Sequence, residues 1–291
     1  MAVAAPAGPV DPEVFHAGCA LWREAGFRVR TRDDVLCRRG YLAGDDARRA
    51  AELMDFVADP EVAAIVCARG GYGVPRILDR LDPAAFRAAR KPLVGFSDVT
   101  ALLLWQRRRA GLMGLHGPML ERGADADQQA FAELLDWLGG GTPPPLRGRG
   151  IRPGVASGRL VGGNLVLVAA SLGSAWEVDT RGAILLVEEV GEAPYRVDRL
   201  LQQLRHAGKL DALAGLGVGD VSTCHDDRYR EPDVATVVAE VAAGLGVPVV
   251  TELPFGHGAR NRPWPVGARA TIDGDAGEIR VLEAGVVRTS W

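Results

Sequence analysis

Strand-like and helix-like segments alternate along the first 110 residues, and this alternation constrains the fold more than any other feature of the sequence. Short segments near residues 3–5, 27–29, 62–67 and 92–95 are typical of strands, and the third, a continuous apolar run bounded by breaker residues, is typical of a strand buried on both faces. Amphipathic segments lie between them, the first starting at the capping residue Asp11. The pattern predicts a parallel sheet with helices on both faces and right-handed crossovers. Binding residues should gather at the carboxyl ends of its strands.

Three glycines followed by a threonine and three prolines, at residues 139–145, interrupt this pattern and cannot continue a helix. We therefore expect an N-terminal α/β domain over residues 1–138, a Gly/Pro linker over 139–153 and a C-terminal domain over 154–291. The C-terminal domain mixes both element types. Strands are expected near residues 157–161, 182–187, 214–221, 248–251, 266–273 and 278–282, and helices near 163–172, 195–207 and 232–243.

Charge and cysteine content narrow the class of protein. Lys+Arg 34 against Asp+Glu 37 gives a net charge of −3, without the basic excess that is typical of nucleic-acid binding. The four cysteines are dispersed and form no C-x-x-C pair or zinc pattern, as expected for reduced thiols. We find neither a secretory signal pattern nor an apolar run of about 18 residues. The expectation is a cytoplasmic protein that needs no metal or cofactor and binds neither nucleic acid nor a membrane.

The segment V-G-F-S-D-V places Ser97 in a sharp turn between a predicted strand and a predicted helix. This is the setting of a nucleophile elbow, in which the hydroxyl is exposed beside the first N–H groups of the helix. The elbow pattern is incomplete, because Val99 stands where the second glycine would be. The same residues also fit a simpler role, in which Ser97 or Asp98 caps the helix.

Three other segments carry polar groups at predicted strand ends. The loop Arg69–Gly73 has three glycines in five residues, so its N–H groups could hold an anion, or the loop could be a tight turn. Glu188 and Glu189 close an apolar run and should point to opposite faces of it, one toward a pocket and the other toward solvent or a salt bridge. His257 lies between two glycines, and His116 follows another predicted strand. An imidazole in such a loop is suited to proton transfer near neutral pH.

Ser97, Glu188 and His257 together supply a nucleophile, an acid and a base. Catalytic triads are defined by geometry, and their order along the chain differs among folds. A triad requires that the tertiary fold bring these three residues together.

Taken together, the motifs give the chain a strong resemblance to the LD-carboxypeptidase family of serine peptidases, also called muramoyltetrapeptide carboxypeptidases. The matching segments run in family order from about residue 3 to about residue 260. They are VAVAAPAGPV, ARGGYGVPRILDRLD, KPLVGFSDVTALL, LHGPM, GRLVGGNLVLVAASLGS, ILLVEEVGEAPYRVDRLLQQL and PFGHG.

The resemblance implies a triad of Ser97, Glu188 and His257, with oxyanion donors at the backbone N–H groups of Asp98 and Gly71. It also implies a flavodoxin- or Rossmann-like N-terminal domain, a β-rich mixed C-terminal domain, an active site between them, and a homodimer.

The implied reaction is the release of terminal D-alanine from the tetrapeptide stem of murein, during recycling of cell-wall fragments. The substrate's carboxylate needs a donor, and Arg69 and Arg196 are both candidates. Asn164 and His116 are further candidates for substrate contact.

Two other functions stay open at this point. Some relatives are self-immunity hydrolases that cleave peptidyl- or aminoacyl-nucleotide antibiotics, and a two-domain protein of this kind could also bind a small ligand without catalysis. The segment after residue 262, including Trp264, has no predicted role.

Overall fold

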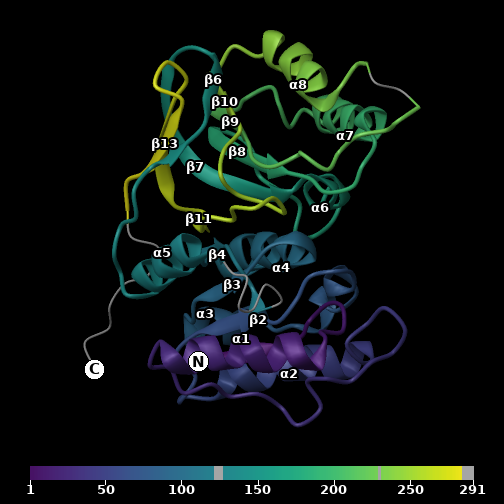
Figure 1. Cartoon of the computed structure of the whole chain (residues 1–291), viewed down its shortest axis with the longest axis vertical. Helices are drawn as coiled ribbons and strands as arrows, with labels where there is room; N and C mark the ends of the chain where they lie inside the picture. The colour runs from purple at the N-terminus through teal and green to yellow at the C-terminus, as the bar shows by residue number, and fades with distance from the viewer. Residues whose placement is uncertain (121–126, 229–230, 284–291) are drawn as a thin grey trace.

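The computed structural model describes residues 1–120, 127–228 and 231–283, which form two sheets arranged along the long axis of the molecule (Figure 1). The first sheet has the order β1-β2-β3-β4-β11, in which β1 to β4 are parallel and β11 joins β4 antiparallel. Its strands are β1 (Ala2–Ala4), β2 (Ile65–Cys67), β3 (Leu93–Gly95), β4 (Gly114–His116) and β11 (Trp264–Val266). The predicted parallel sheet is therefore confirmed.

The helices of this part alternate with its strands. They are α1 (Pro12–Glu24), α2 (Asp46–Ala58), α3 (Pro83–Ala89), α4 (Thr100–Trp105) and α5 (Gln128–Leu138), with the 3₁₀ helices η1 (Val74–Arg76), η2 (Leu78–Arg80) and η3 (Ser97–Val99) and the π-helix η4 (Gln106–Ala110), which continues α4. The strand predicted at residues 27–29 is wrong. Phe27 packs edge-on against Trp22 of α1, with ring centroids 5.2 Å apart, and Arg30 makes an isolated bridge to Ala2.

The second sheet has the order β5-β13-β12-β7-β8-β9-β10-β6. Its parallel strands are β7 (Val155–Asn164), β8 (Ala183–Glu188), β9 (Gly215–Val218) and β10 (Val249–Thr251). Its antiparallel strands are β5 (Leu146–Arg147), β6 (Arg149–Arg152), β12 (Arg269–Asp273) and β13 (Glu278–Val281). The helices α6 (Leu165–Ala170), α7 (Pro194–His206) and α8 (Val234–Ala243) follow β7, β8 and β9 along the chain.

This second sheet curls until its two edges approach each other. Strands β5 and β6 lie at opposite edges, although only Gly148 separates them in the sequence. They fall inside the range expected to be a linker, while β11, from the range expected to be the C-terminal domain, belongs to the first sheet. The division into independent domains stays a prediction.

Glycines in β9 leave the inside of the curled sheet free for large side chains. A Cβ on Gly215 would lie 2.6 Å from Ile272, and one on Gly217 would lie 2.4 Å from Leu186 and 3.0 Å from Ile279. The interior is thus filled by side chains that reach across from β8, β12 and β13, as in other small curled sheets.

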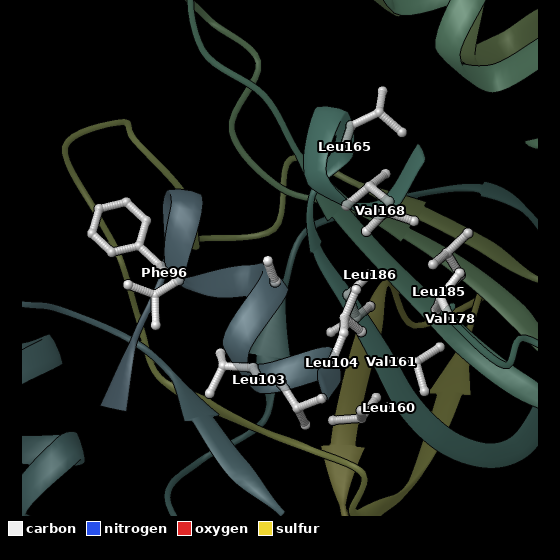
Figure 2. Close-up of a cluster of buried hydrophobic side chains, with 14 of the residues drawn as sticks. Phe96, Leu103, Leu104, Leu160, Val161, Leu165, Val168, Val178, Leu185 and Leu186 are labelled. Atoms are coloured by element: carbon white, nitrogen blue, oxygen red, sulfur yellow. The ribbon is translucent and has the colours of Figure 1, made fainter. Parts of the chain in front are cut away.

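Helix α4 joins the two parts through one apolar core. All six of its residues are buried, which is the pattern of a helix surrounded by protein on every side. Figure 2 shows Leu104 of α4 directed toward Leu160 of β7 and Leu186 of β8. These residues belong to one buried cluster that also includes Ile65 and Leu93 of the first sheet. The helix that follows Ser97 is therefore packed against both sheets.

In the part of the chain that the structure describes, none of the helices combines the length and apolar character that a bilayer crossing requires.

Candidate active site

Ser97 lies at the apex of a tight turn between β3 and α4. Its φ of +60° is in the left-handed region that residues with a side chain rarely adopt, a strain typical of functional sites. The turn requires glycine at position 95, because a Cβ there would lie 2.6 Å from a methyl of Val99. Neither Ser97 nor Asp98 caps the following helix with its side chain. The predicted elbow geometry is present, and the capping alternative is wrong.

A continuous hydrogen-bonded chain links the three residues of the predicted triad. Ser97 Oγ lies 3.0 Å from His257 Nε2, and His257 Nδ1 lies 2.6 Å from Glu188 Oε2. The carboxylate accepts the proton on Nδ1, which leaves Nε2 free to accept the hydroxyl proton of Ser97. The three groups come from the turn after β3, the end of β8 and the loop between β10 and β11.

The surroundings of the imidazole hold it in place. Glu188 is fully buried, and the His257 side chain is 17% exposed. Gly256, at φ +117°, permits the close approach, because a Cβ there would lie 2.8 Å from Glu188 Oε2. Phe96 packs against the imidazole at a centroid distance of 4.8 Å. The ring therefore has one buried acid, one hydroxyl and one aromatic face as neighbours.

The glycine-rich loop 69–73 lies directly beside the nucleophile. A Cβ on Gly70 would lie 2.8 Å from Ser97 Cβ and 2.9 Å from Ser97 Oγ, so any other residue would crowd the hydroxyl. Gly71 follows at φ +102°, and the N–H of Asp98 belongs to the residue after the nucleophile. Both predicted oxyanion donors are therefore next in sequence to groups at the hydroxyl. Gly71 follows Gly70, which lies beside Ser97 Oγ, and Asp98 follows Ser97 itself.

Family models of known proteins match both halves of the chain. The model described as the LD-carboxypeptidase N-terminal domain matches residues 1–117, and the model of the C-terminal domain matches residues 157–272. This chain belongs to the LD-carboxypeptidase family. The resemblance predicted from the sequence is confirmed, and the protein is a serine-type carboxypeptidase of this family, a hydrolase.

Individual relatives agree with this family. The murein tetrapeptide carboxypeptidase of Pseudomonas aeruginosa is 32% identical over 288 residues, which cover 94% of this chain and 93% of that protein. The crystal structure of muramoyltetrapeptide carboxypeptidase from Oxalobacter formigenes is 30% identical, with a TM-score of 0.87, covering 96% of this chain and 97% of that one. A structure of the microcin C7 self-immunity protein MccF has a TM-score of 0.88 at 23% identity, covering 98% and 96%, and shows a shared fold.

Glu189, the second carboxylate of the pair in this LD-carboxypeptidase, faces away from His257. Its oxygens accept hydrogen bonds from the Asn164 side chain at 3.0 Å and from the N–H of Val166 at 2.9 Å. Burial raises the pKa of this carboxyl. The expectation of opposite faces is met, but Glu189 contacts the start of α6 and not solvent or a salt bridge.

The four candidates for substrate contact are largely engaged within the protein. Arg69 donates to the carbonyl of Pro9 at 2.8 Å, and Arg196 pairs with Glu192 at 3.2 Å on the surface. Asn164 also caps α6, through its side-chain oxygen and the N–H of Leu167.

His116 is fully buried, which argues against the expected direct contact with a substrate. Its ring stacks on Trp264 at 4.9 Å and meets Phe255 edge-on at 5.6 Å. Burial, with a smaller contribution from His257, lowers the pKa of this imidazole to about 3, so it stays neutral. Trp264, which had no predicted role, forms one wall of this aromatic cluster.

Three charged residues of α2 that reach the strand ends were not predicted from the sequence. Arg48, Arg49 and Glu52 are largely buried, and Glu52 accepts the N–H of Ala5 at 2.7 Å, directly after β1. Their signal was a charged pair at i and i+4 next to the apolar stripe of the helix, a spacing that is usually read as an exposed ion pair.

Proposed function

We propose that this protein hydrolyses the L,D-peptide bond that releases terminal D-alanine from murein tetrapeptides, and that Ser97, His257 and Glu188 catalyse the reaction. The observation that carries the proposal is the hydrogen-bonded chain from Ser97 Oγ through His257 to Glu188. The relatives named above add support for the substrate class, because two of them are named for murein or muramoyl tetrapeptides.

In the first half of the reaction, Ser97 Oγ attacks the carbonyl carbon that precedes D-alanine while His257 Nε2 takes the hydroxyl proton. The Glu188 carboxylate keeps the proton on Nδ1 and stabilises the imidazolium that forms. The N–H groups of Asp98 and Gly71 hold the oxyanion, and each such donor contributes about 3–4 kcal/mol. When the C–N bond breaks, the imidazolium gives its proton to the leaving amine, and an acyl-enzyme remains on Ser97.

In the second half, water attacks the acyl carbon and His257 accepts the water's proton. The same oxyanion donors stabilise the second tetrahedral intermediate, and its collapse returns the proton to Ser97 Oγ. The products are a tripeptide stem and free D-alanine. We propose further that the substrate comes from recycled cell-wall fragments in the cytoplasm and that the enzyme works as a homodimer.

Release of D-alanine from a UDP- or anhydro-muramyl tetrapeptide, followed by mass spectrometry, tests the proposal. The purified protein should release D-alanine, and the Ser97→Ala variant should not. An aminoacyl sulfamoyl adenylate is incubated in parallel, and turnover of the adenylate alone would favour a self-immunity hydrolase. Binding of either compound without turnover would favour a ligand-binding protein.

A further inference from the structure

A single buried arginine of α2 holds two loops at the carboxyl end of the first sheet. Arg49 is completely buried, and its Nη1 donates to the carbonyl of Pro6 at 2.6 Å and to the carbonyl of Gly73 at 2.8 Å. Its Nη2 donates to Asp46 at 2.5 Å. Pro6 follows β1, and Gly73 ends the glycine-rich loop after β2. A rigid, planar guanidinium can hold several acceptors at fixed angles, which a lysine ammonium cannot do as well.

The side chain of Asp98 holds the same loop from the other side. It is 2% exposed, and its Oδ2 accepts the N–H of Val74, the residue after Gly73, at 2.7 Å. Gly73 is required here, because a Cβ on it would lie 2.6 Å from Arg49 Nη1. The end of the loop is therefore fixed by a cation that binds the carbonyl of Gly73 and a carboxylate that binds the next N–H, that of Val74.

The beginning of the loop is tied to the same arginine by a shorter path. The carbonyl of Gly70, the residue beside Ser97 Oγ, accepts the N–H of Gly8 at 2.9 Å. Gly8 lies two residues after Pro6, whose carbonyl Arg49 holds. Arg49 therefore binds one end of the stretch 70–73 directly and contacts the segment 6–8 that binds the other end, and Gly71 lies between the two ends.

We propose that Arg49 and Asp98 are positioning residues that together fix the N–H of Gly71 as an oxyanion donor, a unit that we call the loop clamp. This inference rests on the proposed serine mechanism. A donor contributes most when it is already aimed at the developing charge, and loss of one donor costs about 10²- to 10³-fold in kcat. Loosening the loop clamp should weaken binding of the transition state and leave binding of the intact substrate unchanged.

Three substitutions test the loop clamp. Arg49→Lys keeps the charge but loses the planar donor set, and should lower kcat about 10- to 1000-fold with KM within threefold of wild type. Asp98→Asn, of equal size, keeps one acceptor oxygen and should lower kcat about tenfold, whereas Asp98→Ala should lower it about 100-fold. The matched control is Arg76→Gln, because the exposed Arg76 side chain also pairs with Asp46, at 2.9 Å, and the one hydrogen bond from Arg76 to the loop, from its backbone N–H to the carbonyl of Gly73, is kept in the variant.

Two measurements separate positioning from a merely structural role. Affinity for a peptide boronic acid, which forms a tetrahedral adduct with Ser97, should fall by the same factor as kcat/KM. Affinity for the uncleaved tetrapeptide, measured in a Ser97→Ala background, should not change. The rate at which a fluorophosphonate labels Ser97 should fall by about 10- to 1000-fold in Arg49→Lys. This measurement needs no peptide substrate. Slowed labelling would support the loop clamp even where the murein proposal fails.

The proposal is overturned if folded Arg49→Lys has a Ser97 labelling rate and a kcat within threefold of wild type. It is also overturned if the variant changes KM and not kcat. Should Arg49→Lys not fold, as judged by circular dichroism, Asp98→Asn decides in its place. An unchanged kcat and labelling rate in folded Asp98→Asn and Asp98→Ala would likewise refute it.

Discussion

The buried carboxylate of Glu188 offers the sharpest test of the catalytic chain, through the substitution Glu188→Gln. In the native structure Oε2 lies 2.6 Å from His257 Nδ1, and Oε1 is buried without a hydrogen-bond partner among the described residues. A glutamine that keeps its oxygen toward Nδ1 would bury its NH₂ without an acceptor. The flipped amide would donate to Nδ1 and so place the imidazole proton on Nε2. A protonated Nε2 can no longer accept the proton of Ser97.

The expected loss follows from the charge that is removed. The imidazolium and the carboxylate have centres about 4 Å apart, and at an effective dielectric constant of about 20 their attraction is about 4 kcal/mol. Since about 1.4 kcal/mol corresponds to a tenfold change in rate, kcat should fall about 10³-fold. The tautomer error increases the loss, and the analogous amide substitution in a Ser-His-Asp triad costs about 10⁴-fold. We therefore expect a loss of about 10³- to 10⁴-fold.

The assay is D-alanine release at pH 8, with the thermal midpoint measured in parallel. The comparison variant is Glu189→Gln, which changes the adjacent carboxylate that binds Asn164 and α6. It should lower the midpoint but keep kcat within tenfold of wild type. A folded Glu188→Gln enzyme with kcat within tenfold of wild type would refute the role of Glu188.

Three further predictions concern individual positions. Because the pKa of His116 is lowered to about 3, the unfolded chain takes up a proton below pH 6.5 that the folded protein does not, so stability is lost as the pH falls from 6.5 toward 3. His116→Phe should remove this dependence. The difference in unfolding free energy between the variant and wild type, measured by urea unfolding, should therefore shift by about 2 kcal/mol in favour of the variant when the pH is lowered from 8 to 5. Gly70→Ala should fold normally but lose at least about 100-fold in kcat, because its Cβ would crowd Ser97 Oγ, whereas Gly246→Ala, with open space around its Cβ, should keep full activity in the same assay. Gly217→Ala would place a methyl 2.4 Å from a leucine methyl and should destabilise the protein by about 1–3 kcal/mol in chemical unfolding, and an unchanged midpoint would contradict the tight packing described for the curled sheet.

The residues of the candidate site could be picked out from local sequence patterns, but their convergence in space could not. Ser97 and Glu188 each follow an apolar run that the structure confirms as a strand, and His257 lies between glycines that a loop requires. Their convergence depends on contacts between segments more than 60 residues apart, which period and composition do not encode. The burial of Arg49 was hidden for the same reason, since a charged residue in a helix looks exposed until its distant acceptors are known.

The strands predicted from the sequence were wrong where pairing depends on distant partners. Residues 146–152 carry no strong alternation of apolar residues, yet they form β5 and β6, because two edges of one sheet are available to them. Residues 27–29 show the opposite case, a strand-like segment, Phe-Arg-Val, whose Phe27 packs against helix α1. In both cases tertiary contacts override the local pattern.

The segment that carries His257 leaves the second sheet at Thr251 and enters the first at Trp264. A gene cut at residues 139–145 would therefore not encode two self-sufficient halves, because the amino-terminal product would lack the edge strand beside β4. Recombination between relatives at this point has the same effect, because β11 of the first sheet is encoded together with the second sheet. Chimaeras should stay active when residues 114–116 and 264–266 come from the same parent.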